Sequence, residues 1–203
     1  TLPKHLDEKV AALHLAGFGP LFEVGAMQDL KDSTQVIAGL DQGGLGLPDR
    51  DDYLKEDAHS KELREKYLAH VAKMFELLGD PADRAAAEAK TVMAIETSLA
   101  EDSMTRVEQR DPDSTYHKMD TAQLQALTPH FSWKRYFIDR GFPGIDTINV
   151  SQPKFFQALD HELASQPLSS WKVYLRWHLI HAMAPEKPDT ASSLTNRLSG
   201  RIW

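Results

Sequence analysis

The sequence contains no cysteine, which excludes disulfide bridges, thiolate nucleophiles and cysteine-ligated zinc sites. Basic residues are few: 23 Lys and Arg stand against 30 Asp and Glu, so the formal net charge is −7. Nucleic-acid-binding surfaces are usually basic, and this balance therefore argues against a nucleic-acid partner. No apolar run reaches the roughly 18 residues that a membrane-spanning helix needs. The longest apolar stretch, residues 171–184, is interrupted by charged and imidazole side chains.

Apolar residues make up 41% of the 203 residues, which is typical of a globular protein with a sizeable core. The periodicity is helical over most of the chain, so we predict a mainly α-helical fold. The sequence starts at Thr1, and we expect it to be a piece of a longer protein. The expected helices are marked by apolar stripes or capping residues at Leu2–Leu13, Leu63–Leu78, Ala82–Met104, Asp120, Ser132, Ser151 with Pro153, and Ser169 or Ser170.

Two short stretches near the N-terminus have the character of β-strands. Residues 21–27 and 34–41 could pair as one small β-hairpin. The glycine-rich residues 42–48 follow directly. They lack the Lys-Ser/Thr ending of a phosphate-binding loop and the three-glycine spacing of a dinucleotide fingerprint. We therefore expect a tight turn between the hairpin and a helix.

Candidate metal ligands are present but incomplete. His161-Glu162 begins like the zincin motif, yet Ser165 stands where the second histidine ligand would be. His178 and His181 could share a helical face, but a stable metal site needs a third or fourth ligand. We expect these two histidines to be satisfied by hydrogen bonds in the core.

A cluster of charge lies at the end of the long helix predicted for residues 82–104. Arg106, Arg110 and Asp111 are followed closely by polar residues up to Lys118. Arginine side chains can hold carboxylates, including the terminus of a peptide. The simpler interpretation is a helix end and loop held together by surface ion pairs. No nucleophile-elbow sequence accompanies the serines and histidines of this chain.

Four segments, in order and with matching spacing, resemble a known family. They are LDQGGLGLPDRDDYL at 40–54, ETSLAEDSMTRVEQRD at 96–111 with YHKM at 116–119, NVSQPKFF at 149–156 and WKVYLRWHLIHAMAP at 171–185. Together they resemble the N-terminal region of bacterial neprilysin-like zinc metalloendopeptidases, family M13. Asp52 departs from the family, which commonly shows a second tyrosine there.

The resemblance implies a partial helical lobe over residues 1–185 that caps a catalytic lobe and encloses a chamber for peptides. It also implies that zinc and its ligands belong to a C-terminal half, so we expect no cofactor and no catalytic residue in this chain. Arg106, Arg110, Asp111 and Asn149 lie in or beside the matched motifs and are candidate chamber or structural contacts. The family suggests an exported or periplasmic protein.

After Pro185 the resemblance stops, so we expect residues 186–203 to be a non-family tail of a truncated or frameshifted product. The favoured hypothesis is a substrate-chamber fragment that is inactive alone. A stand-alone binding module and, more weakly, an independent enzyme built on His178 and His181 or on the 106–118 region are alternatives. The apolar stretch 171–183 beside the break predicts self-association, most simply as a homodimer.

Overall fold

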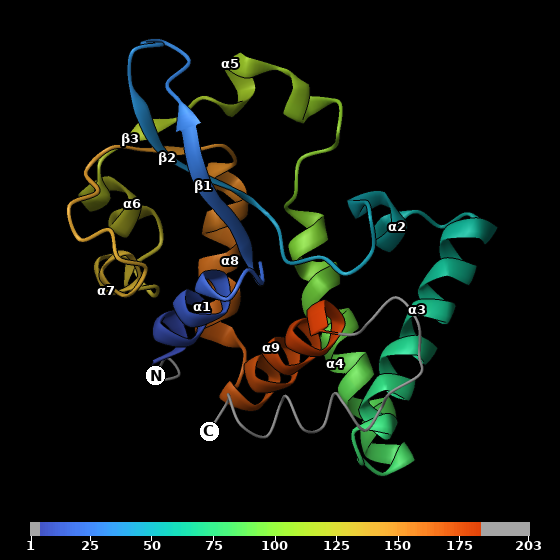
Figure 1. Ribbon diagram of the computed structural model, residues 1–203. Helices are drawn as coiled ribbons and strands as arrows, with labels where there is room; N and C mark the ends of the chain where they lie inside the picture. Colours follow the sequence, from blue (N-terminus) through green and yellow to red (C-terminus); the bar gives the residue numbers. More distant parts are fainter. Residues whose placement is uncertain (1–4, 184–203) are drawn as a thin grey trace.

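The computed structural model describes residues 5–183. Helices dominate it, and the predicted hairpin is present near the N-terminus (Figure 1). The mainly α-helical prediction is therefore confirmed. The elements are α1 (Leu6–Leu15), β1 (Phe22–Gln28), β2 (Val36–Gln42), α2 (Arg50–Leu54), α3 (Ala58–Leu77), α4 (Ala82–Glu101), the 3-10 turn η1 (Glu108–Arg110), α5 (Pro112–Thr115), β3 (Lys118–Met119), α6 (Thr121–Leu127), α7 (Trp133–Asp139), β4 (Ile148–Val150), α8 (Pro153–Ser165) and α9 (Leu168–Met183).

The hairpin is part of a four-stranded mixed sheet with strand order β1-β2-β4-β3. Strands β1 and β2 are antiparallel, with Phe22 opposite Gln42 and Gln28 opposite Val36. Strand β4 runs parallel to β2, and the short β3 closes the far side antiparallel to β4. Strands β3 and β4 are not among the predicted elements, because two or three residues are too few to show an alternating pattern.

Several helix starts follow the capping logic of the sequence, and some differ from it. Asp120 accepts the backbone N–H of Gln123 in a full capping box, as expected of a helix start. Ser132 precedes α7, but its side chain makes no capping hydrogen bond. Helix α8 begins at Pro153 after Gln152 rather than after Ser151, and α9 already begins at Leu168. The missing N–H of Pro153 costs nothing in a first turn.

Two apolar cores lie on either side of the molecule. In Figure 1 the hairpin, α1, α6 and α7 form one side, and the antiparallel pair α3 and α4 forms the other. The first core is rich in aromatic rings, including Phe22, Trp133 and Tyr136. The second packs Phe75 and Val92 between the two long helices.

Helix α9 joins the two cores. Trp171 and Tyr174 belong to the first, whereas Trp177 and Ile180 belong to the second, and all four are completely buried. The apolar stretch that suggested self-association is therefore turned inward within the described residues. Self-association stays a prediction, but the buried apolar face of α9 no longer supports it. Among residues 5–183, none of the helices combines the length and the apolar character that crossing a bilayer requires.

A buried histidine connects α1 to the aromatic core. His14 Nε2 lies 3.0 Å from the Pro20 carbonyl oxygen, and Nδ1 lies 2.5 Å from the Tyr136 hydroxyl. Because a carbonyl only accepts, Nε2 carries the proton, and Nδ1 accepts from the tyrosine. Burial lowers the pKa of His14 to about 4. The imidazole is therefore neutral near pH 7, and both of its nitrogens are satisfied.

We predict that His14 makes the fold acid-sensitive. A folded pKa of about 4 lies below the usual 6.5, so the unfolded chain binds the proton first and stability falls as the pH drops through this window. Between pH 7 and pH 4.5 this group should remove about 2 kcal/mol from the free energy of unfolding. Urea unfolding at both pH values measures it, and His14→Gln should lose less stability on acidification than the parent chain. The exposed His59→Gln is the control, and equal acid sensitivity of all three proteins would contradict the prediction.

Candidate functional site

The glycine-rich loop after β2 is held by a tyrosine that also binds a buried carboxylate. The Tyr53 hydroxyl, on α2, accepts the backbone N–H groups of Gly46 at 3.0 Å and Leu47 at 2.7 Å. It donates to Glu96 Oε2 at 2.7 Å. Glu96 lies on α4 and is 0% exposed. One hydroxyl therefore connects the loop to the centre of the long helix.

Two further tyrosines complete the attachment. Tyr67, on α3, donates to the Glu96 carboxylate at 2.8 Å and accepts the indole N–H of Trp177 at 2.8 Å. Tyr174, on α9, donates to the Gly44 carbonyl at 2.8 Å and accepts the backbone N–H of Leu21 at 3.1 Å. The loop is thus hydrogen-bonded from α2 and α9, and through Tyr53 it is connected to Glu96 of α4. Gly44 has φ of +77°, a conformation that glycine adopts without strain.

The electrostatics keep these hydroxyls in their donor state. Burial first, and then the negative charge of Glu96, raise the pKa of Tyr53 and of Tyr67 far above the usual value. His178 Nε2 lies 3.3 Å from Glu96 Oε1, so an imidazole also faces the carboxylate. A buried carboxylate needs such partners, because an unpaired one would be costly in a dry interior. We name Tyr53, Tyr67, Glu96 and His178 the Glu96 cluster.

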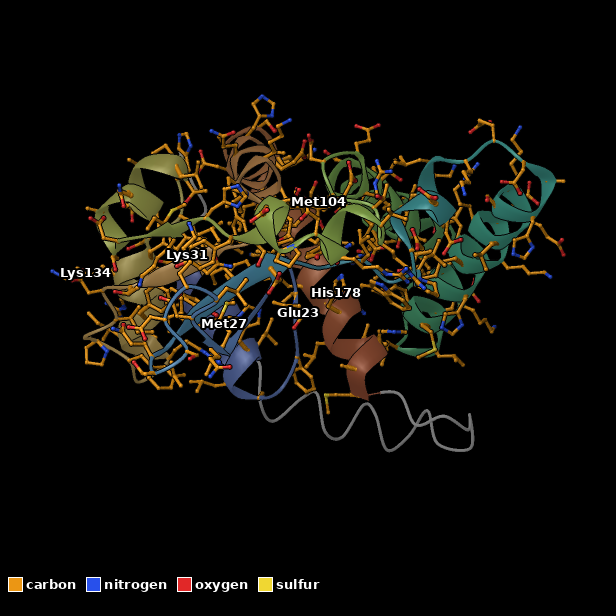
Figure 2. All side chains as sticks on the ribbon, turned by 90° about the horizontal axis from the view of Figure 1, so that it is seen from above. Glu23, Met27, Lys31, Met104, Lys134 and His178 are labelled. Atoms are coloured by element: carbon orange, nitrogen blue, oxygen red, sulfur yellow. The ribbon has the colours of Figure 1, made fainter. Side chains whose placement is uncertain are left out.

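A cavity of about 350 Å³ opens beside this loop. It is lined by the loop residues Gln42 to Pro48, by Ser103 and by Glu23 of β1. Figure 2 shows Glu23 on the hairpin, on the side nearer to His178 of α9. Partial burial, together with Asp41 on the neighbouring strand, raises the pKa of Glu23. The cavity therefore combines many backbone groups with one acidic side chain.

The four residues proposed from the sequence do not converge on one point. Arg106 binds Asp49 at 2.6 Å and the Pro48 carbonyl at 3.1 Å, which fastens the segment after α4 to the end of the glycine-rich loop. Asp111 caps α5 through the Asp113 N–H. Through these contacts, both residues stabilise the surface segments that follow α4.

Asn149 and Arg110 lie in different surroundings. The Asn149 amide, 1% exposed on β4, accepts from the His117 N–H at 2.7 Å and donates to the Thr115 carbonyl at 2.9 Å. It therefore attaches the segment before β3 to the sheet through two hydrogen bonds. Arg110 is exposed at the end of η1, and none of the hydrogen bonds or ion pairs found within residues 5–183 involves its side chain.

The candidate histidines do not form a metal site. Glu162 accepts hydrogen bonds from Ser98 at 2.8 Å and Gln166 at 3.0 Å, whereas His161 is exposed on α8. The rings of His181 and Trp177 lie 5.3 Å apart, and His178 faces Glu96. Within the described ranges, no group of three or more His, Cys, Asp or Glu side chains is placed to hold a metal ion. The side chains of residues 5–183 thus do not fit a zinc site, which needs at least three protein ligands.

The Glu96 cluster is not evident from the sequence, although the sequence contains a signal for it. Glu96 lies at helical spacing between Val92 and Leu99, both of which are buried. A charged residue in the middle of an apolar stripe needs partners, and tyrosines are suitable donors. The Ala- and Glu-rich composition of this helix concealed the stripe, because it is also typical of solvated helices.

Comparisons with known proteins agree on one family. The profile of the N-terminal part of peptidase family M13 matches residues 2–202. Zinc metalloprotease Zmp1 of Mycobacterium tuberculosis, solved with an inhibitor, superposes with a TM-score of 0.86 at 31% identity, covering 97% of this chain and 30% of that protein. Endothelin-converting enzyme 1 of Cavia porcellus is 35% identical over 135 residues, which are 66% of this chain and 18% of that enzyme.

Two further relatives set the scale of the match. An endothelin-converting enzyme homolog of Locusta migratoria is 29% identical over 81% of this chain and 24% of its own length. PepO of Lactobacillus rhamnosis shares the fold at a TM-score of 0.64 and 16% identity. The chain therefore spans about a fifth of the curated relatives and 30% of the solved Zmp1. The profile match also runs through residues 186–202, whose structure lies outside the described range.

We predict that removing the Tyr53 hydroxyl loosens the loop. Tyr53→Phe leaves two backbone N–H groups without a partner and removes one of the two hydroxyls that donate to Glu96, which should cost about 2–3 kcal/mol of unfolding free energy. Tyr116→Phe is the matched control: its hydroxyl bonds only Asp29 in a part-buried position, so water can replace it and the loss should be about 1 kcal/mol or less. Urea unfolding measures both. An equal loss of unfolding free energy in the two variants would show that the Tyr53 hydroxyl stabilises the fold no more than the Tyr116 hydroxyl does.

We also predict that the purified chain holds no stoichiometric zinc. Two adjacent imidazoles without a third ligand bind zinc weakly and lose it on dialysis. Elemental analysis after dialysis is the measurement. One zinc per chain that disappears in His178→Ala or His181→Ala would prove the prediction wrong.

Proposed function

The chain belongs to peptidase family M13, and from this we propose that it forms the N-terminal helical lobe of a zinc metalloendopeptidase and supplies part of the wall of a peptide-binding chamber. The superposition on Zmp1 supports the proposal, because 97% of this chain superposes on 30% of a zinc metalloprotease. The work of such a wall is positional. It has to keep its shape while peptides enter and leave.

The contacts of the described residues support a rigid wall. The Glu96 cluster connects the glycine-rich loop to α4 through Tyr53, and Arg106 fixes the segment after α4 to the same loop. Asn149 and Asp111 set the path of the segment that leads back to the sheet. In this proposal Arg106, Asp111 and Asn149 are structural contacts. Arg110 is the candidate to contact a peptide, because its exposed guanidinium can donate two parallel hydrogen bonds to a carboxylate.

Hydrolysis is not part of what this polypeptide does by itself in the proposal. Peptide hydrolysis by a zinc enzyme requires a metal-activated water at an open three-ligand site. The described residues offer no such ligand set, so no catalytic step is assigned to any of them. The chain contributes shape and charge, and the chemistry belongs to a catalytic partner region.

We predict that the purified 203-residue chain releases no product from a quenched fluorescent peptide beyond the rate in buffer. The reason is the absence of a metal-activated nucleophile among the described residues. The assay is fluorescence over several hours with added zinc. The double variant His178→Ala and His181→Ala is the control, since it removes the adjacent imidazoles of α9. Turnover by the parent chain that is abolished in this variant would mean that the chain is an enzyme in its own right.

A further inference from the structure

Strand β1 is an open edge of the sheet. It is the first strand in the order β1-β2-β4-β3, so β2 is its only neighbour within the described sheet. On the far side of β2, the Ala38 N–H donates to Thr147, and the Leu40 carbonyl accepts from Ser151. Because backbone groups alternate in direction along a strand, Ala38 and Leu40 direct theirs away from β1.

The direction of the free backbone groups of β1 follows from this alternation. Ala26 is opposite Ala38 and Val24 is opposite Leu40, so both belong to non-hydrogen-bonded pairs. Their N–H and C=O groups, and those of Gln28 two residues on, point to the open edge. An extended chain laid along β1 would meet three donors and three acceptors spaced as in a sheet.

The usual protections of an edge strand are missing here. Native edges carry lysine, proline or a β-bulge, each of which blocks the addition of another strand. The seven residues of β1, FEVGAMQ, contain none of the first two, and the register with β2 is continuous over all seven pairs. Glu23 is the only charged residue in the strand. This edge is therefore competent to pair.

Among the described residues, no cation pairs with the charge at the start of β1. Glu23 is directly opposite Asp41, and like charges in such a pair repel. None of the ion pairs found within residues 5–183 includes either carboxylate, and the Glu23 carboxylate lies over Gly19. Glu23 also lines the 350 Å³ cavity beside the glycine-rich loop. A cation placed here would relieve the repulsion, and the cavity has room for its side chain.

A flat patch lies two residues further along the same face. Gly25 is opposite Gly39, and an added Cβ on Gly25 would meet no atom within 4 Å. Met27 covers Gly39 on one side, with its sulfur 2.9 Å from the position of an added Cβ. A bulky apolar side chain from a neighbouring strand would fit over Gly25 and against the thioether.

We propose that the β1 edge and the adjoining cavity bind an extended peptide, with a basic side chain at Glu23 and a bulky apolar side chain over Gly25. In an antiparallel strand these two side chains are two residues apart, and the apolar one comes first. The proposal rests on the proposed function only in taking peptides as the ligands. It places a peptide contact on this lobe.

The experiment uses a fluorescein-labelled probe, acetyl-Thr-Val-Thr-Phe-Thr-Arg-Thr-amide, and fluorescence anisotropy with the whole 203-residue chain. Replacing Arg in the probe by Glu should weaken binding about tenfold, because attraction becomes repulsion at Glu23. Equal binding of the two probes at low salt would overturn the proposal. Binding is measured without hydrolysis, so this result is independent of whether the chain belongs to an active peptidase.

Two protein variants test the site from the other side. Glu23→Gln should weaken the Arg probe about fivefold, whereas Glu65→Gln, an exposed acid on α3, should leave it unchanged. Ala26→Pro removes an N–H that faces the open edge, so the β1–β2 pairing survives and probe binding should fall at least about tenfold. Unchanged binding in both Glu23→Gln and Ala26→Pro would place the peptide elsewhere.

Amide hydrogen exchange gives a direct view of the edge. Saturating probe should slow exchange at Val24, Ala26 and Gln28, and should leave Gly25 and Met27, which already bond β2, nearly unchanged. Protection of the same three amides that rises with protein concentration in the absence of probe would identify a second copy of this chain as the occupant. That outcome, or no protection with probe, would overturn the peptide assignment.

Discussion

The carboxylate of Glu96 is the constraint on which the arrangement of this lobe depends. A charge buried in the protein interior is costly unless it is hydrogen-bonded or paired, so the Glu96 carboxylate requires polar partners close to it. The donors come from α2 and α3, and an imidazole faces it from α9. The need of the two Glu96 carboxylate oxygens for polar partners thereby fixes the positions of α2, α3 and α9 around α4.

The apolar packing fits around this polar centre. Helix α9 carries Trp171 into one core and Trp177 into the other, and the Trp177 indole is anchored to Tyr67 next to Glu96. Because both cores share this helix, neither can shift without the other. The glycine-rich loop lies between them and inherits its shape from the same hydroxyl groups. This arrangement explains how a segment without regular structure keeps a defined cavity beside it.

Part of this structure could be predicted from the sequence. The helices, the hairpin and the capping role of Asp120 follow from periodicity and local chemistry, which act over a few residues. The strand pairing of β4 with β2 could not, since it joins residues more than a hundred positions apart. The same holds for the Glu96 cluster: the stripe on α4 shows that a carboxylate is buried, but not which tyrosines meet it. The family motifs located the loop and Asn149, while their contacts required the fold.

Gly46 has a consequence for how this family can vary. A Cβ on Gly46 would lie 1.9 Å from the Tyr67 hydroxyl oxygen, although the backbone at this glycine is one that other residues adopt. Position 46 therefore requires glycine because a side chain would collide with Tyr67, and not because of its backbone torsion angles. A larger residue at 46 requires a smaller one at 67, and losing the tyrosine would remove one of the two hydroxyls that donate to Glu96. Positions 46, 67 and 96 should thus change together or not at all, as a coupled triplet across related sequences.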